Sequence, residues 1–295
     1  MDQMESSVND DFTLLLEQLQ SVDKFICRKA LIDLQTKVTG RAVSDGHLNH
    51  LFQSLLQVTK NNNVDMLREK SCTILLDLVS TSGRDDGKHE ELLNLVSGRL
   101  PVEHSEEIRL LLTRILHSSL SNMWTEENML KHLDLLTTTT KTILKDRYGE
   151  VVKIGCEVVQ TLSQVNPHFR LQADYFIKPL LSSFNSHPMK VRIMCVKALL
   201  PILVHSSLSV PDIIPVLEKN WSEMSPPLHL VTVKTVGNAA IEFDITEQYL
   251  HLLMPILFLG ICNDFPEIST EATLLWKQLK TKLMTKKAGK YHSVD

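Results

Sequence analysis

The sequence lacks most of the features that mark enzymes, membrane proteins and disulfide-stabilised domains. Its 295 residues contain no Walker-type glycine loop, GxSxG elbow, HExxH pair or EF-hand loop, and the ten glycines are scattered over expected turns. The five cysteines include no CxxC pair. The longest apolar run, residues 249–262, is interrupted by His251 and Pro255 and falls short of the roughly 20 residues that span a bilayer. We therefore expect a soluble protein that is not an enzyme and holds no cofactor.

The net charge and the content of aromatic residues are also low. The net charge of −4 argues against a surface made for nucleic acid or anionic membranes, and the chain offers no small-molecule site. Aromatic residues make up 5% and hydrophobic residues 43%, as expected where Leu, Val and Ile fill thin helical layers. The acidic, polar residues 1–11 do not form a secretory signal. Apolar positions hold Cys72, Cys156 and Cys195, which predicts buried thiols and a reducing, cytoplasmic location.

One segment, residues 186–206, shows the pattern that recurs along the chain. Pro188 stands where a helix is expected to start. Six apolar residues follow at the spacing of one helical face: Val191, Met194, Cys195, Ala198, Leu199 and Ile202. Arg192 comes directly after the first of them, and equivalent positions can be found before and after it in the chain.

Alignment on that position reveals a repeat. The aligned residues are Arg28, Arg68, Arg109, Lys153, Arg192, His229 and Ser269, separated by 40, 41, 44, 39, 37 and 40 positions. A period near forty with two helices per unit is typical of HEAT repeats. The sequence therefore predicts an all-α fold, an α-solenoid of about seven HEAT-type helical pairs forming an armadillo-like superhelix.

The predicted boundaries follow from helix caps, prolines and polar turns. We expect a disordered N-terminus at 1–10, a solenoid over 11–285 and a frayed basic tail at 286–295. The expected pairs are 11–20 with 23–38, 47–59 with 64–80, 89–99 with 104–119, a helix opening at Thr125 with 149–164, 167–184 with 188–205, 210–222 with 226–241, and 245–261 with 266–283.

The recurrent cations Arg28, Arg68, Arg109, Lys153 and Arg192 allow two interpretations. In the favoured one they form a ladder that links neighbouring repeats through hydrogen bonds to polar turn residues. Acceptors stand five or six positions earlier in four repeats: Asp23, Asn62, Glu103 and Ser186. The fourth repeat fits poorly, since Arg147 and Tyr148 occupy those places. In the other interpretation some of these cations line a groove that takes acidic partner segments.

Metal binding and acid–base chemistry have weaker support. His47 and His50 could share a helix face with Asp45 nearby, but that helix supplies no further ligand. Adjacent carboxylates such as Glu106 and Glu107 stand in expected first helical turns, where negative charge stabilises the helix. We expect no metal site and no catalytic residues.

Several segments resemble a known family in order and spacing. They are DRYGEVVKIGCEVVQTLSQV at 146–165 with NPHF at 166–169, and the segments 106–110, 176–181, 187–192, 224–229, 252–259, 263–268 and 275–276. These segments resemble the HEAT-repeat dynein axonemal assembly factors, most clearly over about residues 105–280. His229 and Ser269 depart from the Arg of the family pattern, and the chain resembles only the N-terminal part of such a factor.

The resemblance implies a non-enzymatic cytoplasmic scaffold or co-chaperone. Such proteins help to preassemble outer and inner dynein arms for motile cilia, together with chaperones and with dynein intermediate and heavy chains. The period alone is equally compatible with a general interaction scaffold, such as a transport receptor or a phosphatase scaffold.

Overall fold

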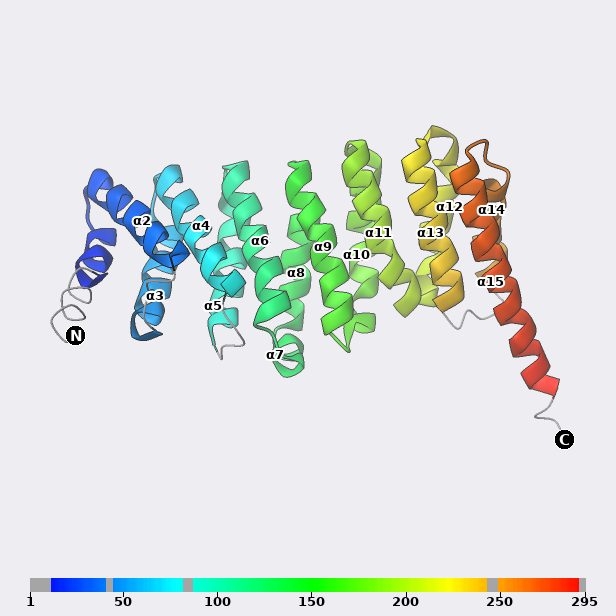
Figure 1. Cartoon of the computed structure of the whole chain (residues 1–295), viewed down its shortest axis with the longest axis horizontal. Coiled ribbons are helices and arrows are strands. Elements are labelled where there is room, and N and C mark those ends of the chain that lie inside the picture. The colour runs from blue at the N-terminus through cyan, green and yellow to red at the C-terminus, as the bar shows by residue number, and fades with distance from the viewer. Residues whose placement is uncertain (1–11, 41–44, 82–86, 243–248, 292–295) are drawn as a thin grey trace. The chain divides into compact units, whose positions relative to one another are not determined.

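The structure is a computed structural model that describes residues 12–40, 45–81, 87–242 and 249–291. Over these residues every regular element is a helix, and short turns join successive helices into pairs (Figure 1). This confirms the prediction of an all-α fold of the solenoid class. The expected disordered segment 1–10 lies outside the described residues.

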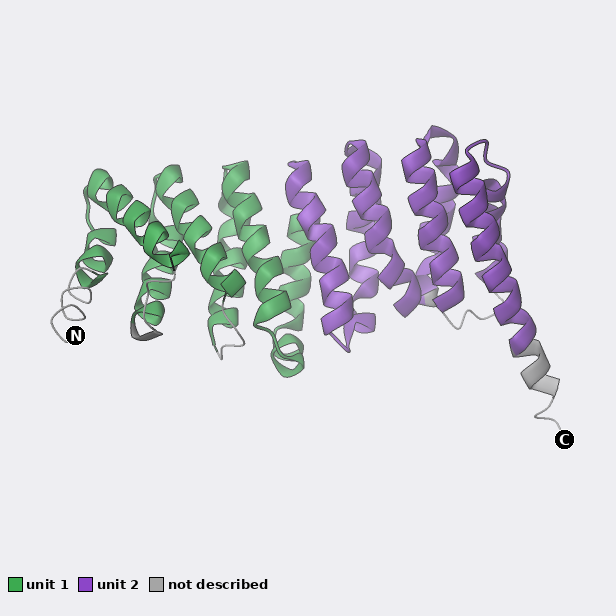
Figure 2. Ribbon diagram, viewed as in Figure 1, with its two compact units in different colours: residues 1–143 green, residues 144–295 purple. Residues whose placement is uncertain are grey.

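The chain forms two compact units, residues 1–143 and 144–295 (Figure 2). Unit 1 begins with a helix at residues 12–19. It continues with α2 (Lys24–Thr39), α3 (Asp45–Asn61), α4 (Asp65–Thr81), α5 (Lys88–Arg99), the 3-10 turn η1 (Leu100–Val102), α6 (Glu106–Asn122), α7 (Glu126–Lys131) and α8 (Leu133–Leu144). The second helix of each pair packs on the second helix of the next, so that α4 lies between α2 and α6.

Unit 2 repeats the same arrangement. Its helices are α9 (Gly149–Val165), η2 (Phe169–Leu171), α10 (Ala173–Ser186), α11 (Met189–His205), η3 (Ser207–Ser209), α12 (Val210–Lys219), η4 (Trp221–Glu223), α13 (Pro226–Glu242), α14 (Leu250–Ile261) and α15 (Pro266–Tyr291). Here α11 packs between α9 and α13, and α13 packs against α15. α15 extends to Tyr291 and so includes part of the segment 286–295 that was expected to fray.

The apolar stripe on α11 explains why this helix forms and where it packs. Five of the six predicted residues are buried, namely Val191, Cys195, Ala198, Leu199 and Ile202, whereas Met194 is only half-buried. α11 begins at Met189, with Pro188 at the N-cap rather than at the first helical position. The shift has little cost because Pro188 lacks an N–H that would need a partner at either position. Burial of such a stripe removes roughly 25 cal/mol of unfavourable hydration per Å² of apolar surface.

The fourth pair differs from the prediction, because its first helix is interrupted. α7 ends at Lys131 and α8 begins at Leu133, while the N–H of His132 donates to the carbonyls of Asn128 and Leu130. The run of four threonines after the break is nevertheless helical. The hydroxyls of Thr137 and Thr139 donate to carbonyls four residues earlier, which gives these buried polar groups partners inside the helix.

The packing of second helices in unit 2 leaves no room for a side chain at Gly237. A Cβ at Gly237 on α13 would lie 2.7 Å from Cδ1 and 3.1 Å from Cβ of Leu275 on α15. By contrast, a Cβ at Gly98 on α5 would meet no atom within 4 Å. We expect Gly237→Ala to lower the free energy of unfolding by about 1–3 kcal/mol because it overpacks the core.

The matched control is Gly98→Ala, which should raise the free energy of unfolding by up to about 1 kcal/mol because it only reduces chain entropy. Urea unfolding followed by circular dichroism measures both changes. Equal effects of the two substitutions would contradict the close approach of α13 and α15.

Candidate functional site

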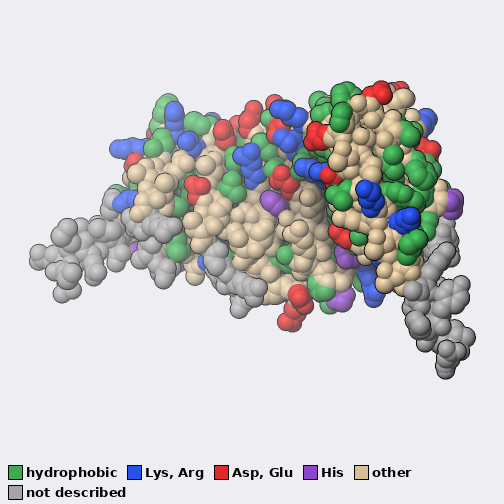
Figure 3. Space-filling view, turned by 45° about the vertical axis from the view of Figure 1, so that its right-hand side comes forward, with side chains coloured by type: hydrophobic (Ala, Val, Ile, Leu, Met, Phe, Trp, Pro, Cys, Tyr) green, Lys and Arg blue, Asp and Glu red, His purple; other side chains and the backbone are tan. Residues whose placement is uncertain are grey.

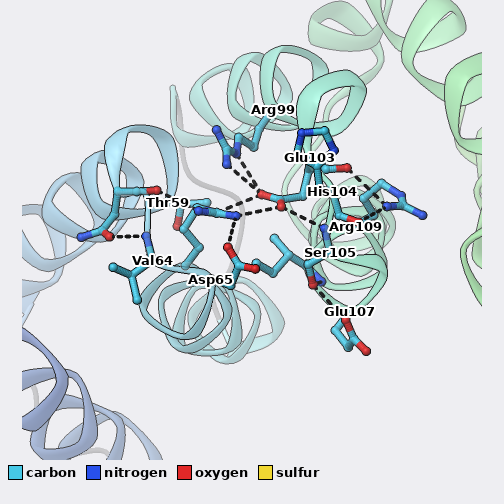
Figure 4. Close-up of polar contacts among 12 residues, drawn as sticks. Thr59, Val64, Asp65, Arg99, Glu103, His104, Ser105, Glu107 and Arg109 are labelled. Atoms are coloured by element: carbon cyan, nitrogen blue, oxygen red, sulfur yellow. Dashed lines mark hydrogen bonds and ion pairs between the residues drawn. The ribbon is translucent and has the colours of Figure 1, made fainter. Parts of the chain in front are cut away.

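A buried ion pair joins the second and third helical pairs in unit 1. Arg68, in the first turn of α4, is 5% exposed, and the side chain of Glu103, in the turn before α6, is 0% exposed. Arg68 Nε donates to Glu103 Oε2 at 2.9 Å, and Arg68 Nη2 donates to Oε1 at 2.8 Å (Figure 4). This two-point geometry is the strongest form of the arginine–carboxylate contact. The two residues are 35 positions apart, so the pair connects neighbouring repeats.

Further donors complete the shell around Glu103. Arg99 Nε, from α5, donates to Glu103 Oε2 at 3.0 Å, and the backbone N–H of Ser105 donates to Oε1 at 3.1 Å. Asp65 Oδ1 accepts from Arg68 Nη2 at 2.8 Å. We name Asp65, Arg68, Arg99 and Glu103 the charged joint. Arg68 and Glu103 are buried, whereas Arg99 is partly exposed and Asp65 is exposed. The additional hydrogen bonds to Arg68 and Glu103 offset the cost of burying their charges.

The surroundings set the protonation of the charged joint. Burial by itself raises the pKa of Glu103, but hydrogen bonds from Arg68, Ser105 and Arg99 outweigh it and hold the pKa below the ordinary value. Burial also lowers the pKa of Arg68, and the contacts with Glu103 and Asp65 more than reverse this. Both groups are therefore ionised at neutral pH.

Two of the five predicted cations bond to the turn that precedes their own helix. Arg68 Nη1 donates to the carbonyl of Asn62 at 3.0 Å. Arg109 Nη1 donates to the carbonyls of His104 at 2.9 Å and Glu103 at 3.3 Å. In both cases the acceptor is the backbone rather than the polar side chain. These bonds satisfy carbonyls that the turn leaves without a helical partner.

The other three predicted cations lie in different surroundings. Arg28 is exposed on α2. Lys153 Nζ is 2.9 Å from Oε2 of Glu150 in the same helix, α9. The guanidinium carbon of Arg192 lies 4.8 Å from the centre of the Phe184 ring, a cation–π contact across the turn between α10 and α11. The structure therefore does not gather the five residues into one site.

His229, where the repeat loses its cation, forms comparable contacts. Its ring stacks on Trp221, with centroids 4.1 Å apart, and its Nε2 lies 2.8 Å from the carbonyl of Trp221. Its Nδ1 lies 3.4 Å from Nδ2 of Asn263, 34 positions further along the chain. His229 is thus within hydrogen-bonding distance of its own turn and of the next repeat.

A second recurring feature is a polar side chain that caps the turn between paired helices. The side-chain oxygens of Asn62, Asp146 and Asn263 accept from the backbone N–H two residues later, at 2.8, 2.8 and 3.1 Å. Such Asx turns hold the chain in a fixed bend. Asp146 was not predicted, because it stands seven positions before Lys153, whereas the polar turn residues of the other repeats stand five or six positions before their cations.

The thiols and histidines form no reactive cluster in the described part of the chain. Cys72, Cys156 and Cys195 are buried, as predicted, and Cys262 is exposed. Burial raises the pKa of Cys72 to about 12. A hydrogen bond to Cys195, 3.9 Å away, and burial raise the pKa of Cys156 well above its ordinary value. Such thiols are poor nucleophiles. Among the described residues, no group of three or more His, Cys, Asp or Glu side chains could hold a metal ion.

Exposed apolar side chains gather at the C-terminal end of unit 2. Phe258, Leu259 and Leu274, on α14 and α15, are at least a third exposed. The space-filling view, in which this end of unit 2 comes forward, shows hydrophobic side chains with basic side chains between them (Figure 3). In the described ranges, no helix combines the length and apolar character needed to cross a membrane.

Paired helices, close second-helix packing and polar contacts at the turns define a helical-repeat protein of the solenoid class. The particular family is also clear, because the family model described as "Dynein axonemal assembly factor 5-like, TPR repeats" matches residues 18–287. The chain belongs to this family.

Curated relatives agree with this assignment. The chain is 25% identical to dynein axonemal assembly factor 5 of Xenopus laevis over 273 residues, covering 90% of this chain and 32% of the relative. It is 27% identical to the Mus musculus protein of the same name over 216 residues, covering 70% of this chain and 25% of the relative. The chain thus spans between a quarter and a third of the length of these relatives.

Solved structures with the same fold include designed armadillo repeat proteins. One, YIII(Dq)4CqI, matches with a TM-score of 0.53 and 14% identity over 90% of this chain and 98% of its own. Another, YIII(Dq.V1)4CPAF in complex with the peptide (KR)4, matches with a TM-score of 0.59 and 15% identity over 78% of this chain and 99% of its own. These similarities show the fold alone.

The charged joint generates a stability prediction. We expect Arg68→Met to lower the free energy of unfolding by about 3–5 kcal/mol, because it removes one partner of a buried pair and leaves Glu103 with too few donors. Arg114, exposed on α6, allows the same substitution as a control. Arg114→Met should change stability by less than about 0.5 kcal/mol, and urea unfolding measures both variants. If both variants changed the free energy of unfolding by less than about 0.5 kcal/mol, the charged joint would have no structural role.

The charged joint also generates a pH prediction. Because the folded pKa of Glu103 is depressed, its stabilising contribution is complete above the unfolded value of about 4.3 and is lost as pH falls through the folded value. We expect the stability difference between the wild type and Glu103→Gln to shrink as pH falls from about 6 towards 3. Unfolding curves across this range provide the measurement. A difference that is constant with pH would show that Glu103 is not ionised in the folded protein.

Proposed function

We propose that the protein is a non-enzymatic cytoplasmic scaffold or co-chaperone in the preassembly of axonemal dynein arms, binding dynein intermediate chain. The observation that carries the proposal is the family match over residues 18–287. The names of the relatives support it, and the fold suits a protein that presents an extended surface to other proteins. Chaperones and dynein heavy chains are the further partners expected in this role.

The described side chains are compatible with a scaffold. Within the described residues, the thiols with raised pKa are buried, and the ion pair of Arg68 with Glu103 joins two neighbouring helical pairs. Arg68 is enclosed by its partners, and Arg109 is bonded to the turn before its helix. We assign these two residues to the repeat ladder. Arg28 on α2 is the ladder position best exposed to take an acidic partner segment.

A loss-of-function experiment in ciliating cells tests the proposal. Deletion of the gene should leave cilia present but without outer and inner dynein arms, as seen by electron microscopy of axoneme cross-sections. Re-expression of the full 295-residue chain should restore the arms. Affinity purification of the tagged chain from the same cells should recover dynein intermediate and heavy chains with chaperones.

Normal dynein arms in the deleted cells would contradict the proposal. Recovery of a nuclear transport GTPase or a phosphatase catalytic subunit in place of dynein chains would favour the general interaction scaffold, which the helical repeat supports equally.

A further inference from the structure

A groove lies between α3 and α5, the first helices of the second and third pairs in unit 1. Its volume is about 400 Å³, within the range of small binding clefts. The groove exists because the two pairs are held together on their other side. There α4 packs extensively on α6, whereas α3 and α5 contact each other little. The charged joint lies at one end, since Arg99 lines the groove and also bonds to Glu103.

The floor of the groove is apolar, and the wall formed by α5 has no side chain at Gly98. Leu56 on α3 and Leu95 on α5 line it and are 8% and 6% exposed. Gly98 also lines it, and a Cβ added there would meet no atom within 4 Å. The missing side chain therefore leaves space that a larger residue would fill. An apolar floor of this kind gains free energy when a partner's apolar side chain covers it.

Amide side chains stand on both walls. Gln57 projects from α3 and Asn94 from α5, and both line the groove. Gln57 Oε1 accepts from Asn61, which leaves the Gln57 NH₂ group as a donor, and no hydrogen bond of the Asn94 side chain occurs within the described residues. An amide offers a donor and an acceptor, which is what an extended backbone needs. A helical ligand has already used its backbone groups internally, so the amides favour an extended one.

The two ends of the groove differ in charge. Lys60 lies at the end of α3, is exposed, and forms no ion pair with any described residue. Glu91, at the start of α5, lies at the other end, where its Oε2 accepts from Gln53 Nε2 at 2.6 Å. A ligand's carboxylate is attracted to Lys60 and repelled by Glu91. This difference sets the direction of a bound segment.

We propose that the α3–α5 groove binds an extended peptide segment of a partner protein, with apolar side chains on Leu56 and Leu95 and an acidic side chain at Lys60. The amides of Gln57 and Asn94 bond to the backbone of the segment. The inference rests on the groove alone and does not depend on the partners proposed above. The groove is a binding surface on the first helices of two pairs. The ladder residues, by contrast, lie on the second helices.

Selection from a random octapeptide phage library on the purified full chain tests the proposal. Enriched peptides should combine apolar residues with Asp or Glu. Synthesised with a fluorescein label, they should bind the wild type and lose more than about tenfold in affinity with Gly98→Trp, which fills the groove. Gly98→Ala, which leaves most of the space open, is the matched control and should retain binding. Fluorescence anisotropy measures the affinities.

A charge reversal gives a second, independent readout. Because Lys60 is exposed, Lys60→Glu should fold normally, weaken the acidic peptides by about two- to fivefold, and select peptides enriched in Lys or Arg. Circular dichroism monitors the folding of each variant.

Three outcomes would overturn the proposal: no peptide enriched on the wild type, equal affinity for wild type and Lys60→Glu, or unchanged binding to a folded Gly98→Trp. None of these outcomes bears on dynein arm assembly, which is tested separately in cells.

Discussion

The structure depends on contact between neighbouring repeats, because a single helical pair cannot bury its own apolar stripe. Within unit 1 the second helices α2, α4 and α6 cover one another, and within unit 2 the same is true of α9, α11, α13 and α15. This packing leaves so little room that Gly237 has no space for a methyl group. Apolar burial provides the driving force, but it is not directional. The register of one pair on the next is therefore set by close packing, as at Gly237, together with polar contacts between repeats.

The charged joint is the strongest such contact in the described part of the chain. Arg68 reaches the turn behind it through Asn62 and the repeat ahead of it through Glu103, so one side chain bonds to two turns. His229 occupies the equivalent position in unit 2 and contacts Trp221 in its own turn and Asn263 in the next repeat. Arg68 and His229 therefore occupy equivalent positions in their repeats and each contact two turns, although one side chain is a guanidinium and the other an imidazole. The joint also leaves the first helices on the other side free to diverge, and the α3–α5 groove lies between them.

The local parts of this arrangement could be predicted from sequence. The period near forty located the second helices, and five of the six residues in the predicted stripe on α11 are buried. The cap of Asp23 on α2 is equally local, since its Oδ1 accepts from the N–H of Phe25. These features depend on residues within one or two helical turns, where spacing alone determines what can meet.

Contacts between repeats could not be predicted in the same way. Glu103 was expected only as an acceptor for Arg109, and its two-point bond to Arg68 depends on how one pair stacks on the next. The stacking of His229 on Trp221 and the helix break at His132 likewise arise from tertiary packing. Periodicity identifies which residues occupy equivalent positions, but it does not give the distances between repeats.

A double-mutant cycle on the charged joint tests the account most directly. The unfolding free energies of the wild type, Arg68→Met, Glu103→Leu and the double variant give the coupling energy between the two side chains. The account predicts a coupling of about 1–3 kcal/mol, with the double variant less destabilised than the sum of the single ones. Additive effects, with a coupling near zero, would contradict the claim that this ion pair joins the two repeats.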